Sequence, residues 1–153
     1  MPQAGNWIGA GDPENAARYG RQTYKLGVYY SIGLAVLIVL MRNHIFRIFT
    51  NDPEVLALGA SLAVAAAIFQ FFDGMRMLGS GILAGAGATV YPMVLTLIVM
   101  WGGFIPLTWY LVVHTGGNVV TAWMGASLCY LLMGFGMWRR FESGKWKKTA
   151  IFK

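Results

Sequence analysis

The chain has 153 residues, of which 57% are hydrophobic and only 12% are charged, and its mean hydropathy is +0.56. Because a soluble domain usually carries about 25% charged residues, we expect lipid to surround most of this chain. Four membrane-spanning helices of ~20 apolar residues each fit into this length and leave no room for a separate soluble domain. We interpret the net charge of +6 as a signal of membrane topology and of contact with anionic lipid. No basic run is interleaved with aromatic residues, so the sequence does not predict binding to nucleic acid.

The first predicted elements are a polar lead-in at residues 1–25 and a membrane span at residues 26–45. Asp12-Pro13-Glu14 has the order of a helix start, since Asp caps a helix and Pro suits its first position. The apolar residues between 43 and 50 have the spacing of a short interfacial helix. His44 has no Cys, Asp or second His at ligand spacing, so we predict no metal site there.

The second span is predicted at residues 53–83, after the helix-start signal Asp52-Pro53-Glu54. Its ~29 residues from position 55 reach roughly 43 Å, which exceeds a hydrocarbon core of ~30 Å, so this helix must tilt, kink or protrude. The third span, at residues 90–113, contains Pro106, which removes a backbone donor and predicts a kink. The fourth span covers residues 119–138, and residues 139–153 form a basic tail.

The distribution of Lys and Arg predicts the orientation of these spans. The lead-in contains three such residues and the tail six, whereas the loop after the first span contains two and the other loops contain none. Four spans put the lead-in and the tail on one side of the membrane. The positive-inside rule then predicts a multi-pass protein of the cell (inner or plasma) membrane with both termini in the cytoplasm.

The strongest functional signal is a polar stripe within the second span. Gln70, Asp73 and Arg76 are three residues apart and would lie along one slanting face of a helix. Charge at that depth is costly and is a functional-site hypothesis by default. Asp73 is a candidate to bind a proton or a monovalent cation, because a low-dielectric surround favours the neutralised carboxylate. The alternative is a purely structural pair of Asp73 with Arg76, and the spacing alone does not separate the two.

Several short segments, in chain order, resemble the multidrug and toxic compound extrusion (MATE) transporters. They are the Gly-Ala-Gly-Asp segment at 9–12, the loop at 49–55, Gln70-x-x-Asp73, residues 81–89 with Pro92-Met93, Trp101 with Pro106-Leu107, Trp123-x-Gly125 and Ser143-Gly144-x-Trp146. The resemblance covers nearly the whole chain. It implies an all-α membrane protein of four transmembrane helices that matches the C-terminal part of the family's C-lobe, from the end of the eighth helix to the twelfth. Ala84 and Ala88 stand where the family often has Arg and Asp.

The resemblance also implies a function. In the NorM-like branch of the family an acid on the tenth helix is implicated in Na⁺ or H⁺ coupling, and Asp73 matches that position. The chain would then be part of a multidrug antiporter working by alternating access, with no enzymatic activity and no cofactor beyond the coupling ion. Hydrophobic, cationic drugs would contact Phe69, Phe72 and Met75, for each of which plain core packing is the alternative. The missing N-terminal helices, including a carboxylate partner on the seventh, would be required.

Two other interpretations stay open at this stage. In one, the chain is a non-transporting membrane remnant or assembly partner, in which Asp73 and Arg76 neutralise each other. In the other, it is a self-contained four-helix protein that oligomerises into a pore or a small exporter.

Overall fold

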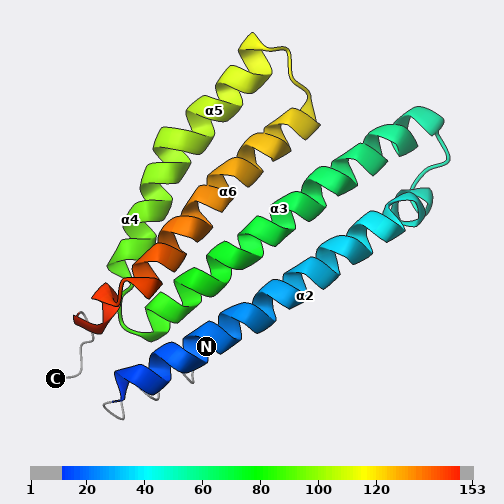
Figure 1. The fold of residues 1–153 in the computed structure, drawn as a ribbon. Coiled ribbons are helices and arrows are strands. Elements are labelled where there is room, and N and C mark those ends of the chain that lie inside the picture. Colours follow the sequence, from blue (N-terminus) through cyan, green and yellow to red (C-terminus); the bar gives the residue numbers. More distant parts are fainter. Residues whose placement is uncertain (1–11, 149–153) are drawn as a thin grey trace.

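The computed structural model describes residues 12–148, and these form long helices joined by short loops (Figure 1). The helices in chain order are α2 (Pro13–Arg47), α3 (Pro53–Gly85), α4 (Val90–Val99), η1 (Met100–Phe104), α5 (Ile105–Trp109), η2 (Tyr110–His114), α6 (Val119–Glu142) and η3 (Lys145–Lys148). The elements from α4 to η2 follow one another without a break and make up one membrane-length helix. Four helices are therefore long and apolar enough to cross a membrane. This confirms the predicted all-α, four-span class for the described part of the chain.

Helix α2 begins at the predicted cap and continues further than the predicted span. Asp12 Oδ1 accepts a hydrogen bond from the Asn15 backbone N–H at 3.0 Å, and Oδ2 accepts one from the Asn15 side chain at 2.6 Å. These two hydrogen bonds hold the pKa of Asp12 below its usual value. The helix then runs to Arg47, so residues 43–47 form its last turns rather than a separate interfacial helix. The Gly-Ala-Gly part of the resemblance at residues 9–11 and the last lysine of the tail lie outside the described residues.

Helix α3 begins at its predicted cap and is the centre of the bundle. The Asp52 carboxylate accepts a hydrogen bond from the backbone N–H of Glu54 at 2.9 Å. Along its length α3 packs between α2 and α6, and the helix from α4 to η2 packs against α6 (Figure 1). Glycine permits the close approach of α3 and α6, since a Cβ at Gly79 would lie only 2.9 Å from Met137 Cβ. The arrangement makes α3 the element that contacts both halves of the described chain.

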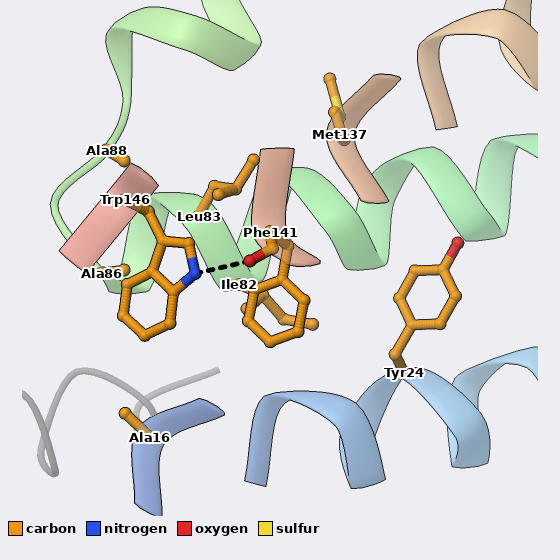
Figure 2. Close-up of a cluster of buried hydrophobic side chains, with 9 residues drawn as sticks. All are labelled: Ala16, Tyr24, Ile82, Leu83, Ala86, Ala88, Met137, Phe141 and Trp146. Carbon is orange, nitrogen blue, oxygen red and sulfur yellow. Dashed lines mark hydrogen bonds between the residues drawn. The ribbon is translucent and has the colours of Figure 1, made fainter. Parts of the chain in front are cut away.

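The beginning of α2 and the end of α6 lie at the same end of the bundle (Figure 1). Arg21 forms an ion pair with Glu142, whose two oxygens accept at 2.8 and 2.9 Å. The same end of the bundle contains a cluster of buried side chains in which the Trp146 indole donates to the Phe141 carbonyl at 2.8 Å (Figure 2). The cluster consists of Ala16, Tyr24, Ile82, Leu83, Ala86, Ala88, Met137, Phe141 and Trp146. These contacts tie the two described ends together, while the cytoplasmic location of this end stays a prediction.

The third helix is irregular around Pro106. Proline has no N–H to donate to the carbonyl four residues earlier, and its ring crowds that carbonyl. A π-helical turn, Met100–Phe104, comes directly before it and widens the helix at this point. The predicted kink at Pro106 thus falls beside a local departure from α-helical geometry, and the bend itself stays a prediction.

The close approach of α3 and α6 can be tested at Gly79. We expect Gly79→Ala to lower the free energy of unfolding by about 1–3 kcal/mol, because the new Cβ overpacks against Met137. Gly33→Ala is the matched control, since a Cβ at Gly33 meets nothing within 4 Å. It should be neutral or stabilising by about 0.5–1 kcal/mol through helix propensity. Unfolding of the detergent-solubilised chain followed by circular dichroism measures both, and equal destabilisation by the two variants would contradict this packing.

Candidate functional site

The polar stripe predicted on α3 is present, and its two charged members form an ion pair. The side chains of Asp73 and Arg76 are 21% and 23% exposed. Arg76 Nη2 and Nε both donate to the same oxygen, Asp73 Oδ1, at 2.6 and 2.9 Å. Within residues 12–148 the second oxygen, Oδ2, accepts no hydrogen bond. The pairing expected from the structural interpretation is therefore observed, and half of the carboxylate stays available to another partner.

Tyr130 of α6 connects this ion pair to a group of aromatic rings. The guanidinium carbon of Arg76 lies 5.1 Å from the centre of the Tyr130 ring, which is cation–π geometry. The same ring packs against Phe69 with centroids 4.6 Å apart. Phe69 also meets Trp123 edge-to-face, with centroids 5.1 Å apart and planes at 80°. One aromatic residue therefore touches both the charged and the apolar part of the α3–α6 interface.

Beside these rings lies a cavity of about 270 Å³. Its walls come from α3, from α6 and from the π turn of the third helix and are almost entirely apolar; they are Phe69, Met100, Phe104, Ala122, Trp123, Ala126 and Tyr130. The volume is close to the lower end of the ~300–1,000 Å³ found for small-molecule sites. Ring faces and a thioether favour flat apolar ligands, and they also attract cations. The cavity is thus suited to an aromatic or hydrophobic, positively charged molecule.

The structure places the other predicted residues outside this cavity. Phe72 contacts Phe71, with ring centroids 5.3 Å apart, and Met75 packs against the buried cluster at the end of the bundle. Gln70 is half-buried and makes no hydrogen bond to another described residue. Pro106 is exposed on the third helix. Of the three predicted substrate-lining side chains, only Phe69 is therefore part of the cavity wall.

Six of the seven wall residues, all except Phe69, are missing from the sequence-based set of candidate site residues. Met100, Phe104 and Tyr130 carried no signal of their own, and Trp123 entered only through the family resemblance. They come from helices other than α3, so their position depends on the register in which those helices pack. No spacing within one segment indicates that register. Among residues 12–148 no group of three or more His, Cys, Asp or Glu side chains is placed to hold a metal ion.

Four apolar helices with a half-buried ion pair define a multi-pass membrane protein. The chain belongs to the MatE family, whose model matches residues 1–110, and this confirms the family inferred from the motifs. It is 28% identical over 147 residues to the probable multidrug resistance protein NorM of Thermotoga maritima, covering 96% of the chain and 32% of that protein. It is 33% identical over 151 residues to the probable multidrug resistance protein NorM of Brucella suis, covering 95% and 31%.

A further relative is the multidrug resistance protein PmpM of Pseudomonas aeruginosa, which is 33% identical over 105 residues, or 69% of the chain and 22% of that protein. The chain spans about a third of the length of the first two relatives. No solved structure matches the chain significantly.

The bridging position of Tyr130 leads to a prediction about stability. We expect Tyr130→Ala to lower the free energy of unfolding by about 2–4 kcal/mol, because it removes ring contacts with both Phe69 and Arg76. Tyr130→Phe keeps the ring, and it should cost less than about 1 kcal/mol because the hydroxyl has no hydrogen-bond partner in the described chain. Unfolding titrations in mixed micelles, followed by tryptophan fluorescence, measure the difference. A loss of equal size in both variants would assign the effect to the hydroxyl and contradict this account.

Proposed function

We propose that the chain forms part of a cation-coupled multidrug efflux antiporter that works by alternating access, with Asp73 as its coupling carboxylate. The observation that carries the proposal is the half-buried Asp73, whose Oδ2 accepts no hydrogen bond from residues 12–148, in the central helix of a MatE-family chain. The relatives named as multidrug resistance proteins support drugs as the substrates. The coupling ion is Na⁺ or H⁺, because either can bind one carboxylate oxygen.

The coupling step follows from competition for the charge of Asp73. Arg76 neutralises this carboxylate in the observed state, through Oδ1 alone. A proton or Na⁺ bound at Oδ2 cancels the negative charge that attracts Arg76. Arg76 then retains the Tyr130 ring as its second partner. Two unit charges ~4 Å apart attract by about 4 kcal/mol at an effective dielectric constant of ~20. This attraction sets an upper limit of roughly a thousandfold on how far ion binding can change a two-state equilibrium, because only its difference between the two states counts.

Drug binding is linked to the same pair through Tyr130. We place the hydrophobic, cationic substrate in the cavity beside Phe69, Trp123 and Tyr130, where ring faces replace its hydration. A cation on the Tyr130 ring competes with Arg76 for the same electron-rich group. The binding of the drug and the binding of the coupling ion therefore influence one another, although the two do not touch. An exchange mechanism requires such coupling between the two binding events.

The transport cycle requires more of the protein than these four helices. Since the chain spans about a third of the first two relatives, we propose that the missing N-terminal helices of the same transporter supply the other lobe and a second carboxylate. We orient the end that carries Arg18, Arg21 and Lys25 toward the cytoplasm, because Arg139 and Arg140 lie at that end as well. Both termini would then be cytoplasmic in the cell membrane.

A second candidate function is supported by the ion pair itself. If Arg76 serves only to neutralise Asp73, the four helices are a non-transporting membrane remnant or assembly partner whose side chains pack but take no part in transport. The two candidates differ in what happens when both charges are removed together.

The decisive variant is therefore a double substitution in the full-length transporter. We expect Asp73→Asn with Arg76→Gln to fold, because no charge is left unpaired, and to lose extrusion of ethidium, a flat aromatic cation, by at least about tenfold. Arg76→Gln alone should retain extrusion with an altered dependence on pH or Na⁺. Dye efflux from energised membrane vesicles measures both.

Unchanged efflux in the double variant would rule out Asp73 as the coupling carboxylate. The control is Arg76→Ala, whose thermal stability separates the candidates. If its stability falls as far as that of Asp73→Asn while efflux persists in both, the two residues are a structural pair.

A further inference from the structure

A second cavity lies at the end of the bundle where the described termini meet. Its volume is about 590 Å³, and it is lined by residues 87–91 and Val94 on one side and by Arg140 on the other. A single water occupies ~30 Å³ in the liquid, so the space accommodates a much larger group. The cavity therefore lies between the loop that follows α3, the start of α4 and the end of α6.

Arg140 has a buried donor without an acceptor. Its Nε is inaccessible to solvent and makes no hydrogen bond within the described chain. The guanidinium carbon lies 5.0 Å from the centre of the Tyr91 ring, which fixes the side chain at the cavity wall. A buried N–H that lacks an acceptor costs about 1–3 kcal/mol, and a ring face offsets only part of this cost. A ligand in the cavity cannot reach this inaccessible Nε, but the two terminal nitrogens of Arg140, which also make no hydrogen bond to a described residue, are accessible donors.

No acidic side chain compensates this charge. All six Asp and Glu residues of the chain belong to the described part, and none of them lines the cavity. The nearest in sequence, Glu142, uses both oxygens to bind Arg21. The adjacent start of α4 adds N–H groups, because Thr89 at its N-cap makes no side-chain hydrogen bond to them. The cavity is a positively charged space without a counterion.

An exposed apolar track leads away from this cavity along α4. Val90, Met93, Val94, Leu97 and Ile98 are between 42% and 66% exposed. The cavity also lies at the end of the apolar helices, where lipid headgroups are expected beside a spanning segment. A ligand that combines an anionic head with a hydrocarbon chain fits both features, whereas free phosphate fits only the first.

We propose that this cavity binds the phosphate of an anionic phospholipid headgroup, with Arg140 as its main ligand and an acyl chain along α4. Phosphate oxygens accept hydrogen bonds from an arginine better than water does, because the interaction is charge-assisted. A lipid without a positive group of its own is preferred, since a choline or ethanolamine would meet a cationic wall. The site is independent of the proposed transport function and would exist in any membrane role of the chain.

The test uses the full chain purified in detergent, with phosphatidylglycerol retention measured by native mass spectrometry. Arg140→Gln should weaken retention about tenfold, the equivalent of one charge-assisted hydrogen bond. Arg139→Gln is the matched control, because it removes the same charge one residue away, where the side chain is exposed and lies 5.7 Å from Phe135. Its retention should stay within about twofold of the unmodified chain.

Any of three outcomes would overturn the proposal. Equal loss in Arg139→Gln and Arg140→Gln would mean a diffuse basic surface. Displacement of phosphatidylglycerol by millimolar sodium phosphate, with the same dependence on Arg140, would mean a free-phosphate site. If circular dichroism shows that Arg140→Gln does not fold, Arg140→Lys takes its place, because it keeps the charge and loses the two terminal donors of the guanidinium. Undiminished lipid retention in that variant would also contradict the proposal.

Discussion

Asp73 and Arg76 lie one helical turn apart within α3 and form an ion pair at 2.6 Å. Burying a lone ion in an apolar environment costs several kcal/mol of free energy. If the partner of a buried ion is removed, that cost is no longer compensated. The pair also sets how α6 must pack. Tyr130 covers the guanidinium, and Gly134 of α6 lies directly against α3, since a Cβ there would be in van der Waals contact with the backbone nitrogen of Arg76 at 3.5 Å. The charged pair and the helix contact thus depend on one another.

The same packing produces the apolar cavity in which we propose that the drug binds. Once Tyr130 lies over Arg76, its ring also meets Phe69, and the small residues Ala122 and Ala126 leave space beside Trp123. A carboxylate with one occupied and one unoccupied oxygen then lies near an apolar, ring-lined cavity, joined to it by a single aromatic residue. This arrangement offers a physical route by which cation loading and drug binding affect each other, and the membership of the chain in the MatE family is consistent with it.

Local features of the structure could be predicted from the sequence, whereas long-range contacts could not. Asp12-Pro13 and Asp52-Pro53 predicted helix starts correctly, because capping involves only neighbouring residues. Apolar run lengths predicted four spans, and the three-residue spacing predicted the stripe on α3. The position of Tyr130 over Arg76 and of Tyr91 beside Arg140 depends on the register between helices far apart in the chain. The continuous α2 differs from expectation because a charged residue such as Arg42 does not interrupt the backbone hydrogen bonds of a helix, which here continue to Arg47.

Infrared difference spectroscopy on the full-length transporter tests the central claim most directly, with arginine isotopically labelled and a step in pH or Na⁺ applied. The account predicts that cation loading changes the carboxylate band of Asp73 and the guanidinium band of Arg76 together, since the ion displaces one from the other. The guanidinium change should disappear in Asp73→Asn. A guanidinium band that does not respond to loading, or a guanidinium response that survives in Asp73→Asn, would contradict the account.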